Sequence, residues 1–263
     1  MDSSIDTNTL RLSIFLGLLI GMSVLEAILP RKARVAPRSG RWLTNLAFAV
    51  INTAALRLLI PIAAVGTAAW AAKNSFGLLN LIALTDIAAF LIAILALDLA
   101  LYWQHVATHK VPVFWRFHKV HHADRDLDAS SGVRFHPIEI CASMLYKMII
   151  VALLGAPVLA VVIFEIILNA CALFNHANVR LPLWLDRILR VVIVTPDYHR
   201  VHHSVVEAET NSNYGFSLTI WDHLFKSYKA QPSSGHDGMT IGLYEHQNSG
   251  PQKLTWSLLL PFK

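Results

Sequence analysis

Long apolar stretches separated by short polar loops are the feature that most constrains this chain of 263 residues. Hydrophobic residues make up 55% of it, charged residues only 15%, and its mean hydropathy is +0.49. A soluble globule would have too little polar surface for so much apolar sequence. The composition therefore predicts an integral membrane protein and excludes a disordered chain, a coiled coil and a disulfide scaffold. The two cysteines, Cys141 and Cys171, lie in or beside apolar stretches, where no structural disulfide is expected.

The first apolar stretch runs from Leu10 to Leu29, which as a helix is long enough to cross a hydrocarbon core of about 30 Å. It follows no basic segment and lacks a small-residue cleavage site, so we expect a retained membrane helix and not a signal peptide. The loop from Arg31 to Arg41 holds five basic residues and no acidic one. Such loops mark the cytoplasmic side of a membrane, so the formal charge of +5 indicates orientation and not nucleic-acid binding.

The next two stretches carry the chain across the membrane again. Residues 42–72 exceed the length of one span and contain Pro61, which predicts a kinked helix or an interfacial helix leading into a span. A tight turn is expected at residues 73–77. A span from Leu78 to about Tyr102 then returns the chain to the cytoplasm.

The last apolar stretch, residues 145–174, is interrupted by Gly155-Ala156-Pro157. We expect a hairpin that turns there, either re-entrant or made of short tilted helices, because similar histidine clusters precede and follow it. From His176 onward the chain is polar and loop-rich, which predicts a cytoplasmic cap.

The predicted fold is therefore all-α: a polytopic membrane helical bundle with a histidine-rich cytoplasmic cap. The sequence has no internal repeat, low-complexity tract or linker, so we expect a single membrane-embedded domain over residues 1–263. In that domain, residues 1–75 supply N-terminal membrane helices and residues 98–228 form the histidine-box catalytic region.

Eight of the thirteen histidines fall in three short patterns. His105 and His109 form an H-x3-H pair at the end of the third span. An H-x2-H-H pattern occurs twice, as His118, His121 and His122 and as His199, His202 and His203. Residues three or four apart share a helix face, so each pattern projects its imidazoles in one direction. Imidazole binds iron, zinc, copper and nickel well, and eight nitrogens are too many for one four-coordinate zinc, which favours two metal ions.

Two polar side chains lie on the same face of the third span as its histidine pair. Asp98 and Tyr102 precede that pair by helical steps of four and three. An acidic residue near the membrane is costly unless paired. We expect Asp98 to orient a ligand imidazole through its second N–H, or to pair with Lys110 or Arg116.

The remaining five histidines are weaker candidates. His136 and His176 flank the predicted hairpin, and each is either a metal ligand or an interfacial histidine. His223, His236 and His246 have no partner at ligand spacing, and we expect them at the surface.

Several segments together resemble the fatty acid hydroxylase/sterol desaturase superfamily. The motifs are His105 to His109, Trp115 to His122, Phe135-His136-Pro137, Asn175 to Asn178, Asp197 to His203, Asn213 to Phe216 and Trp221 to Phe225. The resemblance covers about residues 98–228. It implies a membrane-bound di-iron oxygenase that uses O2 and two electrons to hydroxylate or desaturate a C–H bond of a lipid substrate.

The resemblance also implies a ligand set and a cofactor. The implied metal ligands are His105, His109, His118, His121, His122, His199, His202 and His203, completed by His176 and His136. The cofactor would be two iron ions, for which zinc can substitute in purified protein. We expect Asp98, Tyr102 and Asp197 around the ligands, and Asp98, Glu139 and Asp197 as the carboxylates that balance the metal charge.

The expected partners follow from this chemistry. An apolar slot between the helices would admit a lipid from the bilayer. The sequence has no haem, flavin or ferredoxin motif, so electrons are expected from a separate electron-donor protein. We expect a multi-pass protein of a bacterial inner membrane, with the histidine site on the cytoplasmic side and no nucleic-acid partner.

Other functions remain alternatives. Desaturation starts from the same hydrogen abstraction as hydroxylation, which we favour. A metal transporter would place its ligands at mid-membrane depth, and a bis-histidine cytochrome b would not repeat H-x2-H-H. A non-catalytic scaffold would bind no metal.

Overall fold

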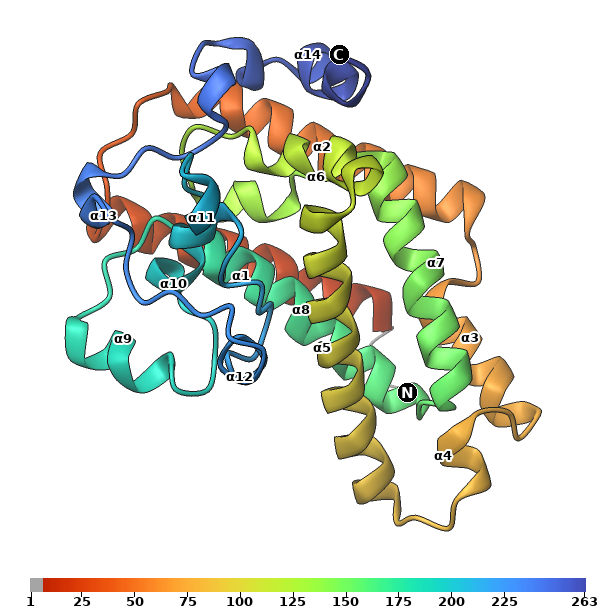
Figure 1. The fold of residues 1–263 in the computed structure, drawn as a ribbon. Helices are drawn as coiled ribbons and strands as arrows, with labels where there is room; N and C mark the ends of the chain where they lie inside the picture. Colours follow the sequence, from red (N-terminus) through yellow and green to blue (C-terminus); the bar gives the residue numbers. More distant parts are fainter. Residues whose placement is uncertain (1–6) are drawn as a thin grey trace, which may run out of the picture.

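The computed structural model describes residues 7–263, which form helices joined by loops (Figure 1). The α-helices are α1 (Thr7–Ile28), α2 (Arg38–Leu59), α3 (Ala63–Lys73), α4 (Leu78–Leu81), α5 (Asp86–Lys110), α6 (Pro112–His122), α7 (Pro137–Leu154), α8 (Val158–His176), α9 (Leu183–Leu189), α10 (Pro196–His202), α11 (Glu207–Thr210), α12 (Ile220–Leu224), α13 (Gly235–Gly238) and α14 (Leu254–Leu259). Four short 3-10 helices complete the set: η1 (Ala129–Val133), η2 (Tyr244–His246), η3 (Gly250–Gln252) and η4 (Leu260–Phe262). The described residues contain isolated β-bridges but no β-strand, which confirms the all-α prediction.

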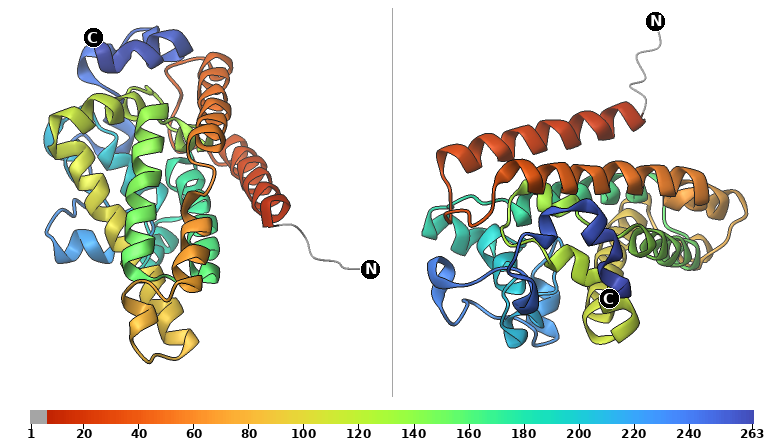
Figure 2. Two further views of the ribbon diagram at one scale, coloured as in Figure 1. Left: turned by 90° about the vertical axis from the view of Figure 1, so that its right-hand side faces the viewer. Right: turned by 90° about the horizontal axis from the view of Figure 1, so that it is seen from above.

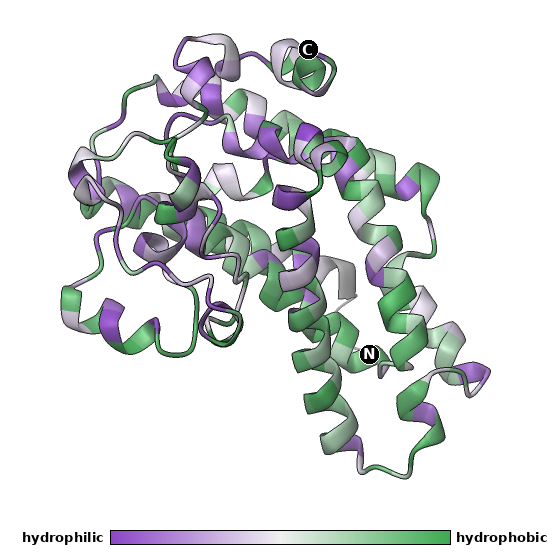
Figure 3. Ribbon diagram, in the orientation of Figure 1, coloured by the Kyte–Doolittle hydropathy of each residue, from purple (hydrophilic) through white to green (hydrophobic). Residues whose placement is uncertain are grey.

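Five segments are long and apolar enough to cross a membrane: Thr9–Ile28, Arg38–Leu81, Asp86–Lys110, Pro137–Leu154 and Val158–His176. At most 39% of the residues in their most apolar windows are buried inside the protein. Many large apolar side chains therefore point outward, as Leu58 does with 80% of its surface exposed. Apolar residues dominate these helices, whereas polar residues gather in the loops at the other end of the molecule (Figure 3). The chain is an integral membrane protein.

The early spans agree with the sequence prediction except in two places. The helix predicted to kink at Pro61 is instead divided there, because α2 ends at Leu59 and α3 begins at Ala63. The continuous span from Leu78 to Tyr102 was wrong: α4 ends at Leu81, and a new helix starts only at Asp86. Thr85 caps this helix, since its hydroxyl oxygen accepts a hydrogen bond from the Ala88 N–H (3.3 Å).

The predicted hairpin is confirmed in α7 and α8. Its helices have 18 and 19 residues and are not short. Gly155 ends α7 in the left-handed conformation (φ 66°), which glycine adopts without a Cβ penalty. The start of α7 and the end of α8 therefore lie at the same end of the bundle, where the cap sits (Figure 1).

The membrane core is packed from α3, α5, α7 and α8. Its buried side chains include Ala64, Leu97, Val151 and Phe164, with alanine frequent among them. Small residues allow membrane helices to approach closely, where dispersion contacts replace the hydrophobic effect. Helix α1 lies on the outside of this bundle (Figure 2) and packs along α8.

Glu26 explains how an acid is accommodated in the first apolar stretch. Its carboxylate is fully buried and accepts hydrogen bonds from the backbone N–H groups of Ala129 (2.7 Å) and Asn178 (3.1 Å). The guanidinium groups of Arg34 and Arg38 each lie 3.6 Å from its second oxygen. Glu26 thereby joins α1 to η1 and to the segment after α8, where the cap meets the membrane helices.

Candidate metal centre

Nine histidines converge where the cap meets α5 and α8, and they form two groups. The five-histidine group is His105, His109, His118, His122 and His202, and the four-histidine group is His121, His176, His199 and His203. In each group the candidate ligand nitrogens all lie within 4.8 Å of one another. All nine side chains except that of His109 are buried. Each group could therefore hold a metal ion.

The two H-x2-H-H patterns divide between the groups in opposite ways. In α6 the outer histidines, His118 and His122, face the five-histidine group, and the middle one faces the other group. In α10 and its C-cap the outer pair, His199 and His203, faces the four-histidine group, and His202 faces the other. In both patterns the histidines four apart face one group and the third histidine faces the other, so the prediction that each pattern projects its imidazoles in one direction was wrong for these two. Each pattern therefore links both sites.

Helix boundaries fix these directions. Helix α5 ends at Lys110 and α6 starts at Pro112, so a single residue turns the chain between the first and second patterns. Helix α10 also starts with proline, and the Thr195 hydroxyl before it accepts a hydrogen bond from the Tyr198 N–H. Proline suits the first helical position because its missing N–H would have no partner there.

Five of the nine imidazoles are oriented by hydrogen bonds from Nδ1. His105, His121, His176 and His202 donate to the carbonyl oxygens of Tyr214 (2.8 Å), Arg134 (3.1 Å), Ala172 (2.7 Å) and Ser212 (2.7 Å), and His118 donates to the Glu139 carboxylate (2.6 Å). A neutral imidazole that donates through Nδ1 presents the lone pair of Nε2. The acceptors therefore direct a metal-binding lone pair into each group.

Burial favours the neutral form of five imidazoles of the cap, those of His121, His122, His199, His202 and His203. Loss of hydration, followed by the effect of neighbouring histidines, lowers the pKa of His121, His122, His199 and His203 well below the usual range. Burial lowers the pKa of His202 to about 3, although its hydrogen bond to Ser212 opposes the shift. Only a neutral imidazole has the lone pair that a metal needs.

The nitrogen contacts test whether metal ions fit. Nε2 of His176 lies 3.0 Å from Nε2 of His121 and 3.1 Å from that of His199. His176 and His121 both donate through Nδ1, so the Nε2 atom of each neutral ring carries a lone pair. The two lone pairs face and repel each other, and a bound cation would offset this repulsion. In the five-histidine group, buried ring nitrogens of His109, His118, His122 and His202 have no hydrogen-bond partner among the described residues. Both groups fit a metal ion.

His136 does not join either group. Its Nδ1 accepts a hydrogen bond from the Ile138 N–H (3.2 Å), and its Nε2 faces the carbonyl oxygen of Leu258 (3.3 Å). The expectation that His136 completes the ligand set is therefore corrected: the residue is the N-cap of α7.

The other predicted site residues make no hydrogen bond to the grouped histidines among the described residues, so the expectation that Asp98 orients a ligand imidazole is not met. Asp98 accepts a hydrogen bond from the Trp221 indole (2.8 Å) and pairs with neither of the cations expected as alternatives. Tyr102 hydrogen-bonds to Ser227 (2.8 Å). Asp197 pairs with Arg31 (2.9 Å) on the cap. Sequence spacing placed these three residues near the centre but did not give their partners.

The three histidines expected at the surface differ in burial. His223 is exposed, as expected, and His246 is partly buried against Trp256. The expectation for His236 was wrong, because its side chain is buried, with Nε2 3.8 Å from Asp197.

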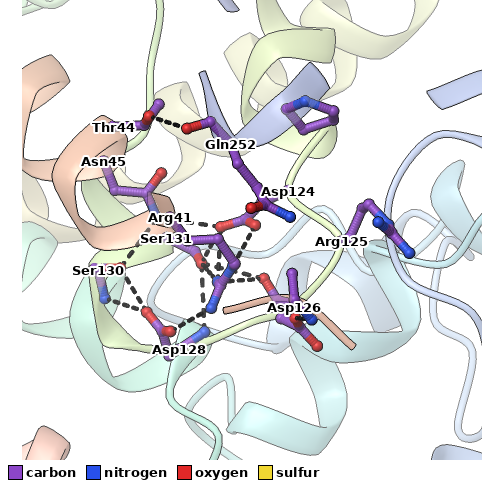
Figure 4. A network of polar contacts seen from close by, with 12 residues as sticks. Arg41, Thr44, Asn45, Asp124, Arg125, Asp126, Asp128, Ser130, Ser131 and Gln252 are labelled. Atoms are coloured by element: carbon purple, nitrogen blue, oxygen red, sulfur yellow. Dashed lines mark hydrogen bonds and ion pairs between the residues drawn. The ribbon is translucent and has the colours of Figure 1, made fainter. Parts of the chain in front are cut away.

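A buried network of ion pairs, which the sequence did not reveal, holds the segment that follows the second histidine pattern. Arg41 of α2 is 1% exposed and reaches Asp124 (2.6 Å) and Asp128 (2.6 Å), as Figure 4 shows. Burial alone would raise the pKa of Asp124, but the Arg41 guanidinium holds it well below its usual range. Because Asp124 follows His122 by two residues, these ion pairs fix the end of α6 against α2.

Asp222 holds in place the loop that contains Tyr214 and Gly215. Its carboxylate accepts hydrogen bonds from the backbone N–H groups of Tyr214 (2.8 Å) and Gly215 (2.6 Å) and from the hydroxyls of Tyr198 (2.8 Å) and Ser227 (2.5 Å). Burial raises the pKa of Asp222 despite these donors. The loop so held carries the Tyr214 carbonyl that orients His105.

A cavity of about 560 Å³ runs from the histidines into the membrane region. Its walls come from α1, α2, α5, α6, α7 and α8, and five ligand candidates from the two groups reach it: His105, His118, His121, His176 and His199. Farther away the walls are mainly apolar, with Phe15, Leu56 and Leu168 among them. Such a cavity suits an alkyl chain.

A second cavity of about 440 Å³ lies between α5, α6 and α7. Trp103 and Phe117 line it, although Trp103 is 46% exposed. Gln104 and Ser143 border both cavities and hydrogen-bond to each other (2.8 Å). Thr108 and Glu139 line both cavities as well.

Comparisons with known proteins match this chain to a hydroxylase family and to proteins named as hydroxylases or a monooxygenase. A family model described as fatty acid hydroxylase matches residues 90–227. The ornithine lipid hydroxylase OlsE of Rhizobium tropici is 34% identical over 145 residues, which are 54% of this chain and 43% of that protein. Human alkylglycerol monooxygenase is 28% identical over 56% of this chain and 32% of its own length. Rat cholesterol 25-hydroxylase is 25% identical over 55% of this chain and 48% of its own length.

The match thus spans less than half the length of each of these three relatives. The region matched by the family model, residues 90–227, contains all nine grouped histidines. No solved structure matches this chain.

Proposed function

Because this chain belongs to the fatty acid hydroxylase family, we propose that it is a membrane-bound oxygenase that hydroxylates a C–H bond of a lipid. The proposed reaction breaks one C–H bond and forms one C–O bond. One oxygen atom of O2 enters the product, and the other leaves as water with two electrons and two protons. Hydroxylation is preferred to desaturation because the names of the three relatives above describe hydroxylases and a monooxygenase.

The observation that carries the proposal is the pair of buried histidine groups at the end of an apolar cavity. We propose that His105, His109, His118, His122 and His202 hold one iron ion and that His121, His176, His199 and His203 hold the other. Two iron ions held there would activate O2 for insertion into a C–H bond. Zinc would occupy the same ligands without this redox chemistry.

The protein's own residues would position the reactants. The carbonyl acceptors and Glu139 hold the imidazoles in one tautomer, and the apolar walls exclude water from the reacting end of the cavity. We propose that residues 1–263 form one domain, in which residues 98–228 carry the chemistry and the helices before residue 75 complete the wall of the cavity.

Two further parts of the proposal concern the surroundings. Two electrons are needed, and the chain's two cysteines cannot hold an iron–sulfur cluster of four thiolates, so we propose a separate electron-donor protein. We propose a bacterial inner membrane as the location, since one relative is a bacterial protein. The basic loop between α1 and α2 lies on the cap side, which favours a position of the histidines in the cytoplasm.

Metal content per chain tests the proposal. We expect the detergent-purified protein to contain about two iron ions per chain and to show no haem absorption, because nine imidazoles form two sites. Two zinc ions would support the sites, and reconstitution with iron would then be required to test the chemistry. No stoichiometric metal after supplementation would contradict the proposal and favour a scaffold.

Single substitutions provide the matched comparison. His121→Ala and His202→Ala each remove one ligand candidate from a different group and should reduce metal content while the protein still inserts in the membrane. His223→Ala is the control, since this histidine is exposed and lies outside both groups. Full metal content in both ligand variants would contradict the assignment.

A further inference from the structure

Three charged side chains meet inside the membrane region, where the sequence pattern did not draw attention to them. Glu165 of α8 lies between Arg11 of α1 and Lys147 of α7. One carboxylate oxygen is 2.9 Å from Nη2 of Arg11, and the other is 3.3 Å from Nζ of Lys147. Glu165 and Lys147 are both buried. Charged residues inside membrane segments are costly, and they commonly mark functional sites.

The charges of this trio do not cancel. Two cations share a single carboxylate, which leaves one positive charge in surroundings of low polarity. Arginine cannot discharge by losing a proton, since its guanidinium remains protonated in proteins. An additional anion beside Arg11 would therefore be stabilised, because an unpaired charge in an apolar medium carries a large desolvation cost.

The position of Arg11 indicates that the additional anion would reach it through the cavity. Of the three side chains, only Arg11 lines the 560 Å³ cavity that reaches the histidines. Along α8, Glu165 precedes His176 by about 16 Å at 1.5 Å per residue. Along α7, Lys147 follows Glu139 by about 12 Å on the same basis. The excess positive charge and the imidazoles thus lie toward opposite ends of one apolar space.

We propose that the lipid that enters this cavity carries an anionic group, a carboxylate or a phosphate, which pairs with Arg11 while its alkyl chain extends toward the histidines. The guanidinium offers donors in the planar arrangement that both anions match. The inference rests on the proposed function, because it identifies the substrate class of the same cavity.

Binding of two matched probes tests the inference without requiring turnover. The full-length protein is placed in nanodiscs of zwitterionic phosphatidylcholine at pH 8, and binding of radiolabelled hexadecanoic acid and hexadecan-1-ol is measured. The probes share one chain and differ in head-group charge. We expect the wild type to bind the acid at least tenfold more tightly than the alcohol, as expected for a charged pair in an apolar site.

The variants are designed to move this preference in opposite directions. Arg11→Gln should bind both probes about equally, and its retained alcohol binding would show that the cavity is intact. Glu165→Gln removes the competing carboxylate and should increase the preference for the acid. Arg57→Gln is the control, because Arg57 is exposed on α2 and does not line the cavity.

The outcomes separate this inference from the proposed function. Equal binding of both probes by the wild type, or an unchanged acid preference in Arg11→Gln, would overturn the anionic substrate but leave the lipid cavity in place. If Arg11→Gln binds neither probe, the Glu165→Gln variant provides the test instead. An acid preference in Glu165→Gln that is equal to or smaller than that of the wild type would overturn the inference. Absence of binding of either probe to the wild type would overturn the inference, whereas the proposed oxygenase would still be tested by its metal content.

Discussion

Among the described residues, Glu139 is the one acidic side chain that hydrogen-bonds to a histidine of either group, through Nδ1 of His118. The four other oriented imidazoles donate to backbone carbonyls, which carry no formal charge. A carboxylate acceptor makes an imidazole a stronger ligand than a carbonyl does, because its negative charge stabilises the positive charge that develops on the ring. His118 is therefore the imidazole whose donor strength depends most on a single side chain.

Glu139→Gln should weaken metal binding by about 10-fold to 100-fold while it preserves the shape of the site. The glutamine carbonyl can still accept the His118 hydrogen bond, so the loss would reflect charge and not position. Competition with a coloured chelator measures the affinity. Glu207→Gln, which changes an exposed acid on α11, should bind as the wild type does. Equal affinity in the two variants would show that Glu139 does not tune the site.

The elements differ in how much the sequence revealed about them. The hairpin was predictable because Gly155 and Pro157 interrupt the apolar run and similar histidine clusters precede and follow it. The start of α5 was not recognised, because Ile82, Ala83 and Leu84 are as apolar as the helices on either side. The Thr85-Asp86 pair was the available signal, since threonine is a favoured N-cap and an acid is favoured in the first helical turn.

The sequence predicted the candidate metal centre only in part. The three patterns identified eight of the nine grouped histidines, but the division into five and four depends on the angle between α6 and α10, which spacing does not contain. Backbone acceptors such as the Tyr214 carbonyl are equally hidden, because every residue carries a carbonyl. The misassignment of His136 arose because an N-cap before proline and a metal ligand look alike in sequence.

Helix η1 packs closely against α8 at Gly132, and this contact provides a test at the scale of elements. A Cβ at this position would overlap the carbonyl group of Ala172, the acceptor that orients His176. Gly132→Ala should force η1 away from α8, lower the stability by about 1–3 kcal/mol and reduce metal occupancy of the four-histidine group. Thermal unfolding in detergent and metal analysis measure the two effects.

Gly21→Ala on α1 is the matched control. A Cβ there meets no atom within 4 Å, and alanine favours a helix over glycine by up to about 1 kcal/mol. Its melting temperature should equal or exceed that of the wild type. A Gly132→Ala protein as stable as this control, with full metal content, would mean that the contact tolerates a methyl group.

The whole molecule has two polar ends of different character, and their placement decides its orientation in the membrane. The end with the cap carries the histidine groups and the basic loop from Arg31 to Arg41. The other end is formed by the turn between α3 and α4 and by the tip of the α7–α8 hairpin (Figure 1). Lys73, the last residue of α3, is the only basic residue next to that turn. Excess Lys and Arg keep a short loop in the cytoplasm, so the charge difference favours a cytoplasmic cap.

Cysteine labelling in intact bacterial spheroplasts tests this orientation in a background where Cys141 and Cys171 are replaced by serine. Asn74→Cys, exposed in the α3–α4 turn, should react with a membrane-impermeant maleimide, and Gln231→Cys, exposed on the cap, should react only after permeabilisation. Labelling of both after permeabilisation is the control for accessibility. The reverse pattern would place the histidine centre outside the cytoplasm. Electrons would then have to reach it from the other side of the membrane, so the choice of donor protein depends on this result.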